Sequence, residues 1–252
     1  MDLSERAAIE ARGTSGAKHP WERARADFTV EQLAPFLPLS GPIVDIGCGD
    51  SYVLSRLKDA FPEAQCLGVD TAYRGQYLAP PGVEIYSTIE QLPSCAGPAG
   101  VLLMMDVIEH VAEPVEFISQ LVRAGLLGPQ TVVFVTVPAW QILFSGQDLC
   151  LGHYRRYRRQ LLRQHLEWAG LKVESTGYFF CSLLLVRVLE VILEKLKIRP
   201  IEASGIVTWK GGEALSAALA AVLRGDYRLG QWLNSRGLTL PGLSCYALSR
   251  LM

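Results

Sequence analysis

The chain has 252 residues, half of them hydrophobic, so it is long enough to bury one substantial core. Its formal net charge of -1 argues against a general polyanion-binding protein, and we expect no nucleic-acid partner. Charged residues make up only 19% and the mean hydropathy is +0.21, which indicates that a ligand, a lipid or another protein covers part of the surface.

The N-terminal sequence MDLSERAAIEARG carries charged residues and no apolar core, so it lacks the pattern of a signal peptide. The six cysteines are scattered and form no C-x-x-C pair, a distribution typical of neither zinc sites nor disulfide frameworks. Both features predict a protein of the reducing cytoplasm.

Helix-like and strand-like segments alternate along most of the chain. The first is a helix over residues 21–37, which Pro38 and Gly41 end. Apolar strands follow, separated by helical stretches such as 51–61 and 114–127. The expected strands cover residues 42–47, 65–70, 83–86, 100–106, 131–138, 171–180 and 243–251, with a helix at 158–170. This alternation predicts an α/β fold with a doubly wound, mostly parallel sheet, because strands that are apolar throughout are covered on both faces.

The segment 181–240, between the last two expected strands, differs from the rest of the chain. It opens with CSLLLVRVLEVILEKLKI, and a further helix, GEALSAALAAVL, follows. The uncharged run at 175–186 is shorter than the roughly 20 apolar residues that a membrane-spanning helix needs. We therefore expect an α-helical insertion before the last strand. Its first helix either packs on the core or a second subunit, or lies in a membrane interface.

A glycine-containing turn, VDIGCGD, follows the first expected strand. Gly47 and Gly49 allow a tight turn and let a ligand approach the backbone amides. Tyr52 stands where a dinucleotide fingerprint needs its third glycine, which disfavours an NAD-dependent oxidoreductase; an ordinary strand-to-helix turn is the other interpretation. Asp70 ends the next strand, 25 positions after Asp45, where a carboxylate can accept two hydrogen bonds from a ribose diol. Together these residues favour a cofactor that contains ribose.

Several sequence blocks resemble the class I S-adenosylmethionine-dependent methyltransferases. VDIGCGD is similar to their first motif and GVD to their ribose-binding acid. MMDVIEHV is similar to the D-V-x-E-H-V block of a large bacterial subgroup, and the stretch from SGQDLCLGHYRRY onward to its S-x-x-D-x-x-x-G-H-x-R-R-Y block. HPWERARADF is similar to an upstream H-W-W-x-x-x-R block, and PGLSCYALSR to the last strand. The resemblance implies a seven-stranded sheet that binds S-adenosylmethionine, with S-adenosylhomocysteine as the product.

The resemblance also implies roles for single residues. Gly47 and Gly49 would face the methionine part of the cofactor, Asp70 would bind the ribose hydroxyls, and Asp45 would fix the turn. Arg25 matches the arginine of the upstream block and could pair with the cofactor carboxylate, since a guanidinium suits a planar carboxylate.

The predicted cofactor-binding set also includes residues that follow the second, third and fourth strands. They are Thr71, Thr88 and Asp106. Ser87 and Thr88 would contact the adenine, although the family usually has an acid at the end of that strand. The family also tends to have glycine in place of Ser51.

Two histidines are candidate general bases for methyl transfer to a hydroxyl. His110 and His153 lie in loops expected at the carboxyl edge of the sheet, and a base there contributes about 10²–10⁴-fold. His110 could instead pack against Val111, and His153 could be a hydrogen-bonded loop histidine. With Asp106 and Glu109 they also resemble a metal site in ubiquinone-pathway O-methyltransferases and in small-RNA ribose methyltransferases. The same block occurs in members without a known metal, so a divalent ion is a secondary hypothesis.

The run HYRRYRR places four arginines within five positions, and Arg163 follows one turn later. The four are Arg155, Arg156, Arg158 and Arg159. They form either a solvated helix start or a site for a phosphate or carboxylate of the substrate. Tyr154 and Tyr157 could stack on bases, but no known RNA-binding module accompanies them.

The sequence thus predicts three parts: an N-terminal helical segment at 1–40, a cofactor-binding domain at 41–180 and 241–252, and a helical insertion at 181–240. We expect a methyltransferase that acts on a small or lipid-like acceptor, at oxygen. The alternative is a non-catalytic cofactor-binding or scaffold protein that docks a partner through the insertion. The apolar insertion also predicts a homodimer contact or peripheral membrane contact.

Overall fold

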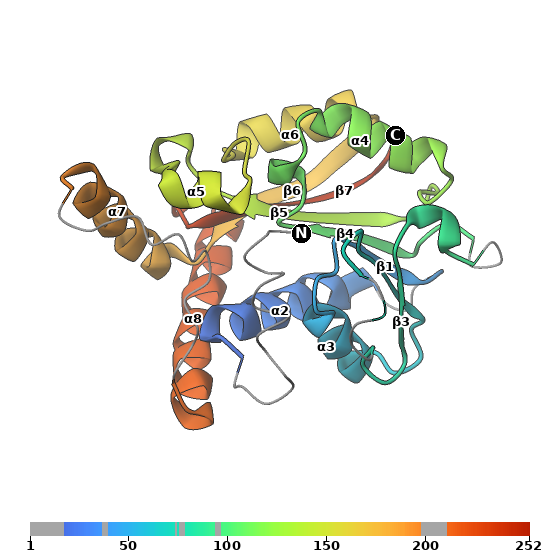
Figure 1. Ribbon diagram of the computed structural model, residues 1–252, viewed down its shortest axis with the longest axis horizontal. Coiled ribbons are helices and arrows are strands. Elements are labelled where there is room, and N and C mark those ends of the chain that lie inside the picture. Colours follow the sequence, from blue (N-terminus) through green and yellow to red (C-terminus); the bar gives the residue numbers. More distant parts are fainter. Residues whose placement is uncertain (1–17, 37–39, 74, 76–78, 94–96, 198–210) are drawn as a thin grey trace.

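The computed structural model describes residues 18–36, 40–73, 75, 79–93, 97–197 and 211–252. Seven strands form one sheet in the order β3-β2-β1-β4-β5-β7-β6 (Figure 1). They are β1 (Ile43–Ile46), β2 (Cys66–Val69), β3 (Val83–Tyr86), β4 (Val101–Met105), β5 (Val132–Pro138), β6 (Leu171–Phe179) and β7 (Ser244–Leu251). All seven strands lie where the sequence predicts them.

The sheet is parallel except at β7. β1 pairs in parallel with both β2 and β4, so that Asp45 lies opposite Gly68 and Leu103. β7 runs antiparallel to β5 and β6. The strand order reverses between β1 and β4, and in doubly wound sheets ligands bind at the carboxyl ends of the strands on either side of such a point. The predicted fold class is confirmed, and it directs attention to the loops after β1, β2 and β4.

Helices cover both faces of the sheet. One face packs against α4 (Pro114–Arg123) and α6 (Arg159–Trp168), and the other against α2 (Pro20–Leu33) and α3 (Tyr52–Ala60) (Figure 1). Side chains of β4 alternate between the two cores, which explains why the strand is apolar at every position.

The predicted N-terminal helix is α2, followed by a 3₁₀ turn at Ala34–Phe36. His19 and Glu22 form a capping box at its start, and Pro20 occupies the first helical position, where no amide hydrogen is needed. The HPWE sequence therefore sets where α2 begins and, one turn later, where Arg25 lies. Pro38, the predicted end of this helix, is outside the described residues.

The segment between β6 and β7 contributes α7 (Cys181–Lys195) and α8 (Glu213–Ser235). α8 crosses α2, and its Leu223 and Tyr227 are buried with Phe28 in the core. α8 is therefore a layer of the fold, whereas α7 extends outward at one end of the sheet (Figure 1). Among the described residues, none of the helices has the length and apolar character needed to cross a membrane. The division of the chain into domains, and contact of 181–240 with a membrane or a second subunit, stay predictions.

Candidate functional site

The glycine turn follows β1 and lies against the loops after β2 and β4. Gly47 and Gly49 have φ values of 75° and 54°, in the left-handed region that favours glycine. A Cβ atom on Gly47 would lie 2.7 Å from Cγ2 of Val107. Ser51 is also left-handed, with φ 60°, a conformation that suits the glycine that the resemblance implies at this position. The backbone amide of Gly47 donates to the carbonyl of Val69 at 2.7 Å, so the turn is anchored to β2.

Asp70 ties the loop after β2 to this turn. Its side chain is buried, with 1% exposed. One carboxylate oxygen accepts a hydrogen bond from the Gly49 amide at 3.0 Å, and the other accepts one from the Ala72 amide at 2.8 Å. A carboxylate has about four acceptor positions, so acceptor capacity remains for a second pair of donors. The sequence predicts Asp70 as a ligand contact, and the structure adds a role in holding the glycine turn.

Arg25 and Asp106 meet at the same edge of the sheet. The Arg25 guanidinium forms an ion pair with the Asp106 carboxylate and lies 4.5 Å from the Trp21 ring centre. Asp106 directly follows β4 and has φ 56°, a conformation that costs a non-glycine residue about 1–2 kcal/mol. The hydroxyl of Thr136 lies 3.5 Å from the second Asp106 oxygen. The structure therefore brings together two residues that were predicted separately to bind the cofactor.

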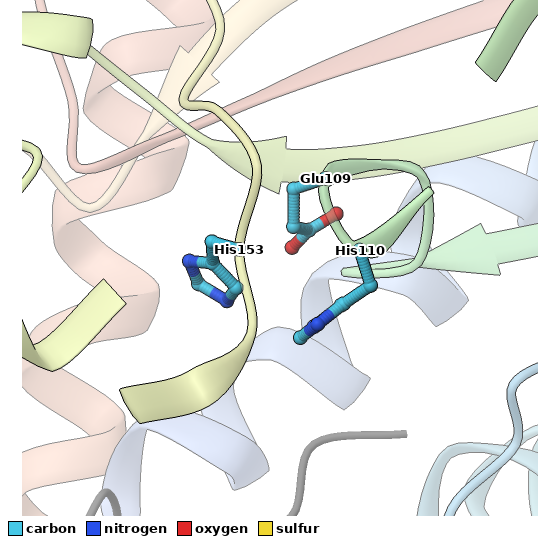
Figure 2. A group of neighbouring side chains, drawn as sticks. All are labelled: Glu109, His110 and His153. Carbon is cyan, nitrogen blue, oxygen red and sulfur yellow. The ribbon is translucent and has the colours of Figure 1, made fainter. Parts of the chain in front are cut away.

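Three side chains beyond β4 form a compact cluster (Figure 2). Glu109 and His110 belong to the 3₁₀ helix Ile108–His110, and His153 follows α5 (Gly146–Leu151). Each offers one potential ligand atom, and these atoms lie within 4.8 Å of one another. The two imidazole rings are 4.6 Å apart and nearly perpendicular. Asp106, predicted from the sequence to join them, pairs with Arg25 and is not part of this cluster.

Burial controls the charge of this cluster. Glu109 is 0% exposed, and within the described residues neither of its carboxylate oxygens has a hydrogen-bond partner. Burial, reinforced by the nearby Asp106 charge, raises the pKa of Glu109 well above its usual range. Burial and the neighbouring His153 lower the pKa of His110 to about 4. His110 is therefore neutral near pH 7 and has a lone pair that can accept a proton or bind a metal ion.

His153 is held by a buried carboxylate. Its Nδ1 lies 2.8 Å from an oxygen of Asp148, which is 0% exposed. The same oxygen accepts a hydrogen bond from Nε of Arg156 at 2.7 Å. Burial by itself raises the pKa of Asp148, but the contacts with His153 and Arg156 outweigh it and lower the pKa to about 2. Asp148 is therefore ionised and acts only as an acceptor.

The family model described as "Methyltransferase domain" matches residues 20–176, more than half of the chain. The chain belongs to this family. The match begins at the first residue of α2 and ends in β6, so it includes the glycine turn and all three residues of the Glu109 cluster.

Curated relatives of this methyltransferase domain carry related names. A Mycolicibacterium smegmatis protein named "probable S-adenosylmethionine-dependent methyltransferase" is 31% identical over 142 residues, 53% of each chain. A ubiquinone biosynthesis O-methyltransferase of Caulobacter vibrioides is 36% identical over 119 residues, 44% of this chain and 46% of the relative. The chain thus spans about half the length of these curated relatives.

Solved structures match over the whole chain. A sarcosine dimethylglycine methyltransferase structure from Galdieria sulphuraria has a TM-score of 0.57 at 15% identity and covers 99% of this chain and 98% of its own. A chain of the complex between the Haloferax volcanii Trm112 methyltransferase activator and a methyltransferase has a TM-score of 0.56 at 14% identity, covering 100% and 98%. At these identities the similarity shows the fold alone, a Rossmann-like methyltransferase fold.

The arginine-rich block of this methyltransferase domain is mostly structural. Arg156 is buried against Asp148, and Tyr157 is 0% exposed, so Tyr157 cannot stack on a base without leaving the core. Arg155 donates to the carbonyl of Ala112 at 2.7 Å, and the Arg159 guanidinium lies 5.5 Å from the Tyr178 ring centre. For Arg156 and Tyr157 the structure favours neither the solvated helix start nor substrate recognition, because both side chains hold the loop that carries His153.

The remaining predicted cofactor residues lie at the same edge of the methyltransferase domain. Thr71 is exposed in the loop after β2, and Asp45 is buried within β1. Thr88 follows β3 and is exposed, and it contacts the Glu90 side chain. The hydroxyl of Ser87 donates to the carbonyl of Tyr73 at 2.8 Å, which joins the loops after β3 and β2.

Two site residues had no predicted role. Asp148 stands within the quoted S-x-x-D-x-x-x-G-H block, and its spacing of five residues before His153 was a usable signal. The helix α5 is so short that a side chain of its first turn meets one that follows its end. Arg187 of α7 also reaches Asp148, with Nη2 3.2 Å from the second oxygen. No local pattern marks Arg187, since it reaches the site only through the packing of α7 on α5.

Proposed function

We propose that this chain is an S-adenosylmethionine-dependent methyltransferase that methylates an oxygen of a small or lipid-like acceptor. The observation that carries the proposal is a buried carboxylate, Asp70, fixed beneath a left-handed glycine turn at the switch point of a methyltransferase-type sheet. The names of the relatives support the cofactor and, for the ubiquinone biosynthesis enzymes, transfer to oxygen.

The proposed cofactor site uses the loops after β1, β2 and β4. Because Gly47 and Gly49 have no side chains, the methionine portion could approach the backbone at these two positions. The remaining acceptor positions of Asp70 would bind the ribose hydroxyls, and the Arg25 guanidinium would bind the cofactor carboxylate at the place where it now contacts Asp106. Thr88 and Thr71 would border the adenine and ribose.

The proposed chemistry is an in-line displacement in which the protein lowers the barrier mainly by aligning the acceptor oxygen, the methyl group and the sulfur. When bound, S-adenosylmethionine supplies a methyl group on a positively charged sulfur. His110 or His153 would take the proton of the acceptor hydroxyl. The cofactor would supply its methyl group to the acceptor oxygen and leave as S-adenosylhomocysteine, with the electron pair of the former carbon–sulfur bond on sulfur. Alignment contributes roughly 7–11 kcal/mol and the base about 10²–10⁴-fold. The lowered pKa of His110 keeps its ring neutral near pH 7, with a lone pair on the imidazole.

A divalent cation is a secondary part of the proposal. The unpartnered oxygens of buried Glu109, with the nearby nitrogens of His110 and His153, match the oxygen and nitrogen donors that divalent metals accept. Such an ion would lower the pKa of an acceptor hydroxyl. Titration of the protein with Mn²⁺ or Zn²⁺ by calorimetry should show one site that Glu109→Gln weakens at least about 10-fold. Equal affinity in the variant would remove the metal from the proposal.

Calorimetric titration with S-adenosylhomocysteine, and separately with NAD⁺, tests the cofactor assignment. We expect micromolar binding of S-adenosylhomocysteine and none of NAD⁺, because Tyr52 replaces the third glycine of the dinucleotide fingerprint. The absence of S-adenosylhomocysteine binding in protein that unfolds cooperatively would refute the proposal.

A non-catalytic scaffold is the second candidate, and the surface of α7 favours it. Leu185, Leu189 and Leu196 are 74%, 56% and 62% exposed. Transfer of labelled methyl groups into a cell extract separates the two functions. The enzyme should label a product. The enzyme activity should be lost in His110→Ala and His153→Ala, so that no product is labelled, whereas His165→Ala should still label the product.

Co-sedimentation with liposomes tests membrane contact of α7. Leu185→Asp and Leu189→Asp replace exposed leucines with charged residues, so each change should reduce the amount of protein that sediments with the liposomes.

A further inference from the structure

Asp148 is the centre of a buried network that joins three segments of the chain. One oxygen of Asp148 faces Nδ1 of His153 at 2.8 Å and Nε of Arg156 at 2.7 Å. The other oxygen accepts hydrogen bonds from Nη2 of Arg187 at 3.2 Å and from the Ser145 amide at 3.0 Å. Charge-assisted hydrogen bonds of this kind fix the orientation of a carboxylate strongly.

The network determines which nitrogen of His153 carries hydrogen. An ionised carboxylate between two arginines has no hydrogen to give, so the 2.8 Å contact requires that Nδ1 of His153 is the donor. In the neutral imidazole, the other nitrogen, Nε2, then carries a lone pair. His153 lies beside His110 and Glu109 in the cluster (Figure 2).

We propose that Asp148 is a positioning residue that holds His153 as the Nδ1–H tautomer, with its Nε2 lone pair available to the reaction, and that Arg187 of α7 holds Asp148 in place. This inference rests on the proposed function for its catalytic meaning. Through Arg187, the helix α7 of the segment 181–240 is then a structural part of the candidate active site.

Arg187 is well placed for this role. Its side chain is buried, with 7% exposed, although Leu185 and Leu189 on the same helix are mostly exposed. Besides Asp148 it donates to the hydroxyl of Ser145 at 2.7 Å. A second contact joins the same helices, because the Gly146 amide donates to the Glu194 carboxylate at 2.9 Å. α7 is therefore fixed on the start of α5, where Asp148 lies.

The tautomer can be measured without knowing the methyl acceptor. The chain has four histidines, so a two-bond ¹H–¹⁵N correlation spectrum of protein labelled in the imidazole nitrogens is simple to assign with His→Gln variants. In the wild type at pH 8 we expect His153 to show a protonated Nδ1 and an unprotonated Nε2. Any other protonation pattern of His153 overturns the proposal, and this measurement depends on no variant that might unfold.

Asp148→Asn tests whether the carboxylate sets the tautomer. Two obligatory donors, the Ser145 amide and Arg187, face one oxygen of Asp148, and only one, Arg156, faces the other. The asparagine oxygen should therefore face the pair, and its NH₂ group should displace Arg156 and face His153. Nδ1 of His153 then has to accept, and the spectrum should change to the Nε2–H tautomer. A folded Asp148→Asn protein that keeps the Nδ1–H tautomer contradicts the role of the carboxylate.

Arg187→Gln and Arg224→Gln form a matched pair for the role of α7. Each arginine lies in a helix of 181–240 and forms an ion pair with an aspartate, Asp148 or Asp27. Arg187→Gln should shift the His153 imidazole signals and lower labelled methyl transfer into extract about 10–100-fold, the range for such supporting contacts, with unchanged affinity for S-adenosylhomocysteine. Arg224→Gln should do neither, and equal effects of the two variants would refute the link.

The outcomes also separate this inference from the proposed function. If His153 has the expected tautomer but the protein does not bind S-adenosylhomocysteine, the methyltransferase proposal fails and the positioning contact stands. If S-adenosylhomocysteine binds but His153 carries its hydrogen on Nε2, the positioning proposal fails and the methyltransferase proposal stands.

Discussion

The glycine turn and the histidine cluster lie at the same edge of the sheet but are built in different ways. The turn consists of backbone conformations and one carboxylate within residues 47–72, a single stretch of chain. The cluster consists of side chains from the loop after β4 and from the loop after α5, and it is supported by Asp148 of α5 and Arg187 of α7. We infer a division of labour in which the turn controls cofactor affinity and the cluster controls turnover.

The largest expected effect is loss of cofactor binding in Asp70→Ala. This change removes the acceptor of the Gly49 and Ala72 amides and the proposed ribose contact, and hydrogen bonds to a charged group contribute about 1.5–3 kcal/mol each. Affinity for S-adenosylhomocysteine should fall at least about 100-fold by calorimetry. Asp59→Ala, at an exposed aspartate of α3, is the control. If His110→Ala weakened binding as much as Asp70→Ala, the division of labour would be wrong.

Gly47→Ala and Gly125→Ala test whether the turn depends on close backbone packing. Both glycines have φ 75°, so an alanine costs about 1–2 kcal/mol at either site. Only at Gly47 does the new Cβ meet a neighbour, Val107 at 2.7 Å, which adds about 1–3 kcal/mol. Urea unfolding should show the greater loss for Gly47→Ala, with part of it recovered by adding Val107→Ala. Equal losses at the two sites would contradict the packing argument.

Burial of His110 in the histidine cluster should make the free energy of unfolding depend on pH. The pKa of His110 is about 4 in the folded protein and near 6.5 when unfolded, so the unfolded chain binds more protons between these values. The contribution of His110 to the free energy of unfolding should therefore decrease as pH falls from about 6.5 to about 4. The raised pKa of Glu109 acts in the opposite direction, so His110 is isolated by comparing the wild type with a His110 variant. Because the ring is partly exposed, we expect a loss of about 1–2 kcal/mol.

His110→Gln is the comparison for this pH experiment. The variant has no imidazole at position 110, so its unfolding free energy should fall less over the same pH interval. Thermal or urea unfolding at pH 6.5, 5.5 and 4.5 measures the difference between the two proteins. Parallel curves for wild type and variant would show that His110 is not buried as a neutral ring.

The smallest effect is expected at Asp106, which lies between the two regions. Asparagine tolerates a left-handed conformation and keeps the size of the side chain, so Asp106→Asn should change the free energy of unfolding by less than about 1 kcal/mol. Asp106→Val should cost more, because a β-branched residue is strained at φ 56°. Equal stabilities of the two variants in urea would argue against the left-handed backbone at this position.

The sequence predicted the fold and the glycine turn because both depend on local information. Apolar strands separated by helices specify the sheet, and Gly47, Gly49 and Asp70 stand at strand ends, where the register of β1 and β2 brings them together. The start of α2 was predicted to within one residue, and the structure shows a local capping box formed by His19 and Glu22 there.

The arrangement of the cluster was harder to predict because it depends on long-range packing. His110 and His153 were predicted to lie at the same edge, but the exclusion of Asp106 depends on Arg25, 81 residues earlier in the chain. Arg187 reaches Asp148 across 39 residues through the contact of α7 with α5. No spacing rule in the sequence encodes these contacts. Arg156 and Tyr157 likewise fit a surface block by composition, although packing buries both.

A crystal structure with S-adenosylhomocysteine bound tests the central claim most directly. We expect the ligand's methionine portion to lie along Gly47 and Gly49, its ribose hydroxyls to contact Asp70, and its sulfur to face His110 and His153. A ligand whose sulfur points away from both histidines, or one bound elsewhere on the molecule, would contradict this expectation.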